Sequence, residues 1–496
     1  MDENVVFNNQ ENTQNQELPQ SQEIPMQQLP NNQVAPPGPP VQPLSSPPPI
    51  SPDSSLPPPS GFDFSFFSIG NIAKIILAIV VLIVIGFLAF NFVSSRSKKA
   101  NSENVTLTYW GLWEDSQVFQ PIISDFEKQN PKIKINYVKQ DAKQYRQRLV
   151  TRIENGTGPD IFRFHNTWRR QLSNILLPLP DGTIRKTDFQ KWFYPVAQTD
   201  LVKNGAIYGI PMQIDTLSLF INPEIFQAAG QKTPSTWDDF SKVASALTVK
   251  DETGKIKTAG AAMGTFNNIT HAPDVISLLF AQNGVNLENP SQTNKNTMEA
   301  LEYYNSFVRE GENVWDNTQD ESILAFAKGN LAMYFGYSWD VFSIKYYNPN
   351  ASFQIHPVPR LPGRNNTIAS YWAEGVSVKS KHQQAALLFM KFLSQKETEQ
   401  KLFSETSKTR LFGEPYARTD LADSLKDNLM IYPFVSQGKD ATSSFFASGT
   451  YDEGLNSKMN KYLEDAVNSM LNSTSAETAV ETLSKGVSQV LSEYGQ

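Results

Sequence analysis

Residues 105–139 read VTLTYWGLWEDSQVFQPIISDFEKQNPKIKINYVK, with a helical pattern between two alternating ones. Residues 105–110 and 132–138 alternate apolar with polar side chains and are rich in β-formers, which predicts two strands. Between them, apolar residues from Val118 to Phe126 recur at helical spacing, and this helix is expected to end near Asn130. Strand, helix and strand in this order indicate a parallel sheet covered by helices.

The same pattern continues downstream. Tyr145 to Ile153 predicts a second helix, and Gly156 to Asp160 leads into apolar Ile161-Phe162, a third strand. The predicted fold class is therefore α/β. In such sheets ligands bind beyond the carboxyl ends of the strands, which makes the loops after Trp110 and Phe164 candidate binding loops.

The chain before Phe62 has a different composition, dominated by Gln, Asn, Pro and Ser. It holds too few large apolar residues to offset the entropy of ordering, so residues 1–70 are predicted to be a disordered tail. Its proline runs favour polyproline II segments, which serve either as a spacer or as a docking site for a proline-recognising partner.

A transmembrane helix is predicted at residues 71–95, because Ile75 to Ser95 carries no charge and has about the twenty residues that a bilayer requires. A helix packed on a protein core would show a polar face, and this stretch has none. It also lies too far from the N-terminus to be a signal peptide. The charges that flank this stretch bear on which side of the membrane the large domain lies. The tail has no Lys or Arg before Lys74, whereas Arg96, Lys98 and Lys99 follow the span, and the positive-inside rule then places the large domain inside.

Composition also excludes several classes of function. The net charge of -7 argues against a nucleic-acid partner, which usually meets a basic face. The absence of cysteine excludes disulfides, thiolate catalysis, Cys-ligated zinc and a lipid-modified cysteine anchor. With four histidines and no HExxH-type pairing, no metal or other cofactor is expected.

The order of short motifs along nearly all of residues 105–496 resembles the extracellular solute-binding proteins of ABC importers (family 1), and most closely their sugar-binding, maltodextrin-binding-protein-like branch. Two departures stand out, since the family often has Tyr-Asn-Lys at Ile221-Asn-Pro223 and a lipobox cysteine that this chain lacks. The motifs are Tyr109-Trp-Gly, Phe126-Glu-Lys-Gln-Asn-Pro131, Gly158-Pro-Asp-Ile161, Tyr208-Gly-Ile-Pro211, Asp215 to Asn222, Pro234 to Phe240, Phe326 to Met333, Gly336-Tyr-Ser-Trp339 and Glu374-Gly-Val-Ser-Val378.

The resemblance implies a two-lobed periplasmic-binding-protein-like fold of type II, not an enzyme. The ligand would be a sugar or oligosaccharide held between the lobes, and the other partners would be permease subunits of an ABC transporter and the membrane. It also implies that the binding domain lies outside the cytoplasm. The positive-inside rule, applied to the charges that flank the span, predicts the opposite location. After a linker at 96–104, the predicted lobes are 105–213 with 375–425 (lobe 1) and 214–374 with 426–496 (lobe 2).

A sugar offers apolar ring faces and a rim of hydroxyls, so its site should mix aromatic side chains with carboxylates and amides. Residues of these types occur in the candidate loops and at the family's ligand positions, and Trp339 matches a stacking aromatic of the family. The predicted ligand-binding residues are Trp110, Trp113, Glu114, Asn166, Trp168, Gln213, Asp215, Trp339, Tyr371, Trp372 and Glu374. Weaker candidates are His165, Asn267, Asn268, His271 and the stretch Ser443 to Ala447.

Other residues of the same types receive structural roles. Asp160 is expected to cap backbone in a turn. Trp192, Trp237 and Trp315 are expected to have structural roles, with Ser235 or Thr236 capping the helix that starts at Trp237.

Three alternatives to solute capture stay open at this point. A surface glycoside hydrolase or lyase needs two carboxylates with separate roles, and no pair stands out among Glu114, Asp215 and Glu374. A metal-ion binder is suggested by the pairs Tyr303-Tyr304 and Tyr346-Tyr347. A sensor subunit would use the same cleft and report ligand through the span.

Overall fold

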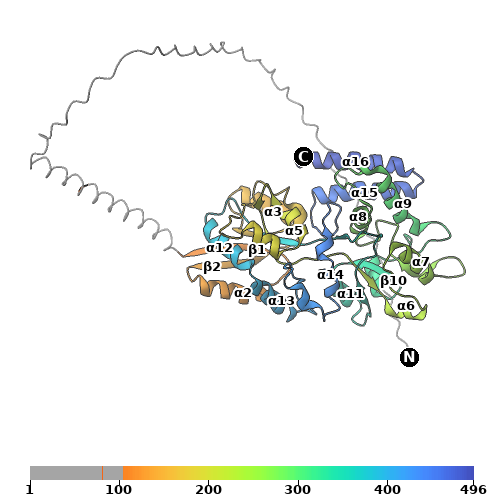
Figure 1. Cartoon of the computed structure of the whole chain (residues 1–496), viewed down its shortest axis with the longest axis horizontal. Coiled ribbons are helices and arrows are strands. Elements are labelled where there is room, and N and C mark those ends of the chain that lie inside the picture. The colour runs from red at the N-terminus through yellow and green to blue at the C-terminus, as the bar shows by residue number, and fades with distance from the viewer. Residues whose placement is uncertain (1–80, 82–103, 496) are drawn as a thin grey trace, which may run out of the picture. The chain divides into compact units, whose positions relative to one another are not determined.

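The predicted strand–helix–strand pattern forms the edge of the first sheet. The computed structural model describes Val81 and residues 104–495 (Figure 1). Strands β1 (Val105–Gly111) and β2 (Ile133–Lys139) run parallel, with Val105 beside Ile133, and helix α2 (Ser116–Gln129) connects them. The alternation works as expected, since Leu107 and Tyr109 of β1 are buried.

The first sheet is completed by strands that come from distant parts of the chain. Its order is β2-β1-β3-β13-β6. Strand β3 (Ile161–His165) is parallel to β1, whereas β13 (Trp372–Val376) is antiparallel both to β3 and to β6 (Ile210–Pro211). Helix α3 (Tyr145–Glu154) connects β2 to β3, as predicted. Helix α12 (Gln383–Leu393) packs on β1 and β13, and α13 (Lys396–Ser407) on α2.

A second sheet has the order β11-β7-β10-β9-β8. Its central strand β10 is antiparallel to β7 and parallel to β9. The strands are β7 (Ser218–Ile221), β8 (Val249–Lys250), β9 (Ile256–Ala261), β10 (Leu331–Gly336) and β11 (Gln354–His356). Helices of this part include α6 (Pro223–Ala228), α7 (Trp237–Leu247), α8 (Ala272–Asn283), α9 (Asn294–Asn305), α10 (Ser322–Ala327) and α11 (Asp340–Tyr347). Helices α15 (Leu455–Leu471) and α16 (Ala476–Glu493) lie side by side (Figure 1).

Each sheet has its own hydrophobic core, so we name the part built on the first sheet lobe 1 and the part built on the second lobe 2. The core of lobe 1 draws on residues 107–214 and 369–402, with Ala417. The core of lobe 2 draws on residues 217–368 and 412–491, except for Ala417, which belongs to the core of lobe 1. A two-lobed α/β architecture is thus confirmed, while the predicted boundaries at 213/214, 374/375 and 425/426 stay a prediction.

Several local predictions are also confirmed. Thr236 caps α7, because its side chain accepts a hydrogen bond from the Asp239 amide (3.1 Å). Asp160 also accepts a hydrogen bond from backbone, but the donor is the Thr108 amide of β1 (2.9 Å) and not an amide of its own turn. Trp237 and Trp315 are buried, and the Arg418 guanidinium covers the ring of half-buried Trp192.

The structure describes almost none of the residues to which the N-terminal predictions apply. Apart from Val81 and Asn104, the predicted tail (1–70), span (71–95) and linker (96–104) lie outside the described residues. Within the described part of the chain, no helix combines the length and the apolar character needed to cross a bilayer.

Candidate functional site

Four predicted ligand residues are tryptophans of lobe 1 that belong to one aromatic cluster. The ring of Trp113 lies edge-on to Trp372, with centroids 5.4 Å apart, and Trp372 lies edge-on to Trp168 at 5.2 Å. Tyr145 joins Trp110 to this cluster at 6.4 Å and contacts Trp168 at 6.1 Å. Trp168 and Trp372 are buried, whereas Trp110 and Trp113 are half-buried. The structure therefore brings these four residues together and leaves two of them partly accessible.

The end of β1 positions this cluster. Gly111 has no side chain, and a Cβ there would lie inside the ring of Tyr137, so glycine is what lets that tyrosine pack under the loop. The Tyr137 hydroxyl donates to the Glu114 carbonyl at 2.8 Å and holds the loop that carries Trp113. Trp372 belongs to the cluster because strand β13 pairs with β3, which places Trp372 opposite His165.

Two of the predicted carboxylates, Glu114 and Glu374, meet at one buried arginine. The Arg163 guanidinium donates to Glu374 from Nε (2.7 Å) and to Glu114 from Nη1, and all three side chains are almost fully buried. Burial raises the pKa of Glu374, and Arg163 opposes that shift. Burial would lower the pKa of Arg163, but Glu114 and Glu374 raise it well above its ordinary value. We call these three residues the lobe 1 ionic cluster.

The sequence reasoning did not single out Arg163. A signal for it exists, because an arginine inside the apolar run of β3 is costly unless a buried carboxylate meets it. One oxygen of each glutamate, Glu114 Oε1 and Glu374 Oε2, has no hydrogen-bond partner among the described residues. The two carboxylates therefore keep unused acceptors inside the protein.

Asp215 lies where the chain passes from lobe 1 to lobe 2. Its Oδ2 accepts hydrogen bonds from the amide (2.9 Å) and the hydroxyl of Ser338, the residue before Trp339. Burial raises the pKa of Asp215 well above its ordinary value, and the bonds from Ser338 work against that rise. Gln213, another predicted ligand residue two positions earlier in the chain, is also buried. Asp215 thus connects the crossing segment to the loop that carries Trp339.

Trp339 is half-buried in lobe 2 and stacks on Tyr337, with centroids 4.4 Å apart and planes 18° apart. The next residue, Asp340, accepts a hydrogen bond from His271 Nε2 at 2.7 Å. Asp274 accepts from the Tyr337 hydroxyl at 2.8 Å. Burial would lower the pKa of His271, but Asp340 and Asp274 raise it above its ordinary value. We call His271, Asp274 and Asp340 the lobe 2 ionic cluster.

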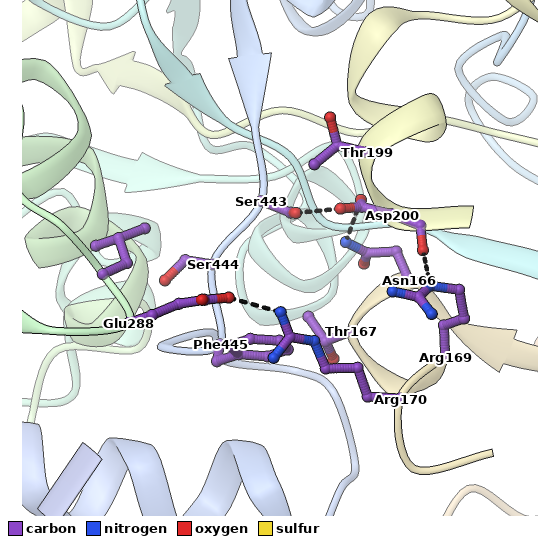
Figure 2. A pocket seen from close by; sticks show the side chains of 11 residues that line it. Asn166, Thr167, Arg169, Arg170, Thr199, Asp200, Glu288, Ser443, Ser444 and Phe445 are labelled. Atoms are coloured by element: carbon purple, nitrogen blue, oxygen red, sulfur yellow. Dashed lines mark hydrogen bonds and ion pairs between the residues drawn. The ribbon is translucent and has the colours of Figure 1, made fainter. Parts of the chain in front are cut away.

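A polar pocket of about 190 Å³ lies between the lobes. Asp200 lines this pocket and accepts hydrogen bonds from Asn166 (2.9 Å) and Ser443 (Figure 2). It also accepts one from the hydroxyl of Tyr371 (2.8 Å). At that spot two predicted residues, Asn166 and Tyr371, share one carboxylate that the sequence reasoning missed. Across the pocket, Arg170 of lobe 1 forms an ion pair with Glu288 of lobe 2 at 2.6 Å and lies over the ring of Phe445 (Figure 2).

The weaker candidates differ in burial and in their hydrogen-bond partners. His165 is buried in lobe 1 and pairs with the hydroxyls of Thr167 (2.8 Å) and Ser370 (3.0 Å), and burial lowers its pKa to about 3. In lobe 2, Asn267 is exposed, whereas Asn268 donates to the Asp316 carbonyl at 2.9 Å.

The hydroxyl groups of the Tyr303-Tyr304 pair are engaged inside lobe 2, whereas Tyr346 and Tyr347 are exposed. Tyr303 and Tyr304 donate their hydroxyl hydrogens to the carbonyls of Trp237 and Thr265. No group of three or more His, Asp or Glu side chains within residues 104–495 is placed to hold a metal ion.

Comparisons with known proteins agree with this architecture. Residues 110–400 match the family model of bacterial extracellular solute-binding proteins. A multiple sugar-binding protein of Streptococcus mutans serotype c is 24% identical over 424 residues, which cover 77% of this chain and 94% of the relative. An arabinooligosaccharide-binding protein of Bacillus subtilis is 27% identical over 222 residues, 42% of this chain and 48% of the relative.

Solved structures show the same fold. The sugar-binding protein MalE of Xanthomonas citri superimposes with a TM-score of 0.65 at 20% identity, covering 78% of this chain and 98% of that one. A cyclo/maltodextrin-binding protein complexed with maltotetraose superimposes with a TM-score of 0.62 at 17% identity, covering 77% and 96%. The expected resemblance is therefore confirmed.

Proposed function

We propose, from the premise that this chain belongs to the bacterial extracellular solute-binding protein family, that it captures a sugar or oligosaccharide between its two lobes. The related proteins are named as binding proteins, and the expectation that this chain is not an enzyme is confirmed on that basis. Family membership also supports a domain that works outside the cytoplasm.

The observation that carries the proposal is the pair of partly exposed tryptophans, Trp113 in lobe 1 and Trp339 in lobe 2. Each ring is backed by another aromatic ring, Trp372 behind Trp113 and Tyr337 against Trp339. Rigid aromatic faces of this kind suit the C–H faces of sugar rings and lose little entropy on binding. Contacts from both lobes to one ligand would favour the closed form.

We propose two roles for the predicted ligand residues. Those with accessible surface contact the sugar directly, and the buried ones hold the contacting loops in place. Glu114, Asp215 and Glu374 belong to the second group, because each carboxylate is tied to Arg163 or to Ser338. Asn166 is buried as well, and its side chain is tied to Asp200. The direct contacts then come from Trp110, Trp113 and Trp339.

Membrane anchoring and delivery to an ABC importer permease complete the proposal. The apolar stretch 75–95 supports a single-pass anchor, and the relatives' family supports an importer. Protease added to intact cells tests the topology. An external domain is degraded without lysis, whereas an internal domain survives until the cells are opened.

The binding proposal is tested with the domain from residue 101 onward. Isothermal titration against a panel of oligosaccharides is expected to find at least one ligand, and binding of peptides or polyamines alone would show that the substrate class is wrong. The variant Trp339→Ala should weaken sugar binding by about tenfold, because it removes a stacking face. Trp315→Phe, inside the lobe 2 core, controls for general effects of losing a tryptophan.

A further inference from the structure

Tyr451 is an exposed aromatic residue whose backbone is in the left-handed region. Its side chain is 52% exposed, and its backbone has φ of 51°, in the left-handed region that residues other than glycine rarely adopt. A conformation of this kind is strained and persists only where the surroundings enforce it. Strained residues of this kind occur at ligand sites, but Gln144, Asn204 and Ser473 are also exposed with positive φ, so the contacts of Tyr451 must carry the argument.

The next residue supplies the restraint. The Asp452 carboxylate accepts hydrogen bonds from the amides of Gly454 (2.8 Å) and Asn456 (2.9 Å) at the start of α15. From lobe 1 it receives Arg146 Nε (2.7 Å) and Gln171 Nε2 (2.8 Å). Its side chain is completely buried. A fourfold anchor adjacent to an exposed tyrosine fixes where that tyrosine can point.

The segment Gly449–Asp452 lies close to both accessible tryptophans. The ring of Tyr451 contacts that of Trp113 in lobe 1, with centroids 5.3 Å apart and planes 48° apart. Two residues earlier, Gly449 lies next to Trp339 in lobe 2, since a Cβ built there would lie 3.8 Å from the indole. The segment Gly449–Asp452 therefore contacts Trp113 through Tyr451 and lies beside Trp339 at Gly449.

We infer that Tyr451 is a further specificity-determining residue, which stacks on a pyranose ring beside Trp113 and favours sugars that present an uninterrupted C–H face. This inference rests on the proposed function. A tilted pair of rings, rather than a single flat one, offers an angled surface to one sugar ring or to two successive rings. The exposed hydroxyl of Tyr451 adds a group able to pair with a sugar hydroxyl at the rim.

The test measures affinity for the tightest oligosaccharide that the panel yields. Tyr451→Ala is expected to weaken binding by about tenfold, since it removes an aromatic contact. Tyr451→Phe, which retains the ring, should stay within about threefold of the unaltered protein. Tyr346→Ala is the matched control, because that tyrosine is 85% exposed on α11 and should leave affinity unchanged. Equal affinity of the unaltered protein and Tyr451→Ala overturns the inference and leaves the proposed function standing.

Tyr451→Gly separates binding from folding. Glycine accepts the positive φ without strain, so this variant should melt at or above the temperature of the unaltered protein and still bind as weakly as Tyr451→Ala. Retained affinity in Tyr451→Gly contradicts a stacking role even if Tyr451→Ala is unstable. If the unaltered protein binds no oligosaccharide at all, the proposed function itself fails, and this inference fails with it.

Discussion

Lobe 1 and lobe 2 use the same local arrangement with different cations. In each lobe a partly exposed tryptophan is followed by a buried acid, Trp113 by Glu114 and Trp339 by Asp340. In lobe 1 the acid meets the guanidinium of Arg163, and in lobe 2 it meets the imidazole of His271. Both acids therefore hold the loop of a proposed stacking residue by a buried ionic contact.

The difference lies in how the cations titrate. A guanidinium stays charged at any pH where the protein is folded, so the lobe 1 ionic cluster keeps its cation. An imidazole loses its proton near neutrality, and the raised pKa of His271 extends the range in which it is charged. The comparison teaches that support of Trp113 should depend little on pH, whereas support of Trp339 should weaken as pH rises.

The largest expected effect comes from removing the cation of lobe 1. Arg163→Met leaves Glu114 and Glu374 buried without a counter-charge, which should cost about 3–5 kcal/mol of the free energy of unfolding. Urea unfolding followed by tryptophan fluorescence measures the loss. Arg185→Met is the control, because Arg185 is exposed to solvent and its pair with Asp188 should contribute little to stability. Equal losses in the two variants would contradict a structural role for the cluster.

Removing the cation of lobe 2 should cost less. In His271→Asn, Asp340 keeps hydrogen bonds from the Tyr337 amide (2.9 Å) and the Tyr334 hydroxyl (3.1 Å), so we expect a loss of about 1–3 kcal/mol at pH 6. A raised pKa means that the contribution is complete below about pH 6.5 and is lost as pH rises through the folded-state value. The difference in unfolding free energy between the two proteins should accordingly shrink from pH 6 to pH 9. A constant difference would show that His271 stays in one protonation state.

His165 of lobe 1 should behave in the opposite sense. Burial lowers its pKa to about 3, so the folded protein holds it neutral while the unfolded chain takes up a proton below about pH 6.5. Stability should then fall as pH drops from 6.5 toward 3, by up to about 1.4 kcal/mol per pH unit. His165→Gln should cost about 1 kcal/mol at pH 7 and flatten the acid limb of the stability curve. An unchanged acid limb would contradict a neutral buried imidazole.

Local pattern was enough to predict much of the fold. The strands and helices from Val105 to His165 follow the alternating and helical periods, because one face of each element is buried. Thr236 was predictable as a cap for the same reason, since the helix that it starts needs an acceptor for its first amides. The unusual Asn222-Pro223 is explained too, because Asn222 caps α6 and proline suits its first turn.

The site was less predictable, because its contacts join distant parts of the chain. Arg163 meets Glu374 across 211 positions, and Arg146 meets Asp452 across 306. Residue type and the family resemblance marked Glu374 as a ligand candidate, but no local pattern shows that its carboxylate is buried against an arginine. Tyr451 was missed for the same reason, since its strained backbone and exposure follow from tertiary contacts.

The smallest expected effect concerns the ion pair that joins the lobes at the polar pocket. Arg170 and Glu288 keep 24% and 49% of their side-chain surface exposed, so Arg170→Met should lower the free energy of unfolding by about 0.5 kcal/mol, and by less at high salt. Lys485→Met, which breaks an exposed pair within α16 of lobe 2, is the matched control. A loss for Arg170→Met as large as that for Arg163→Met would mean that the lobes depend on their contact, rather than on their own buried clusters, for stability.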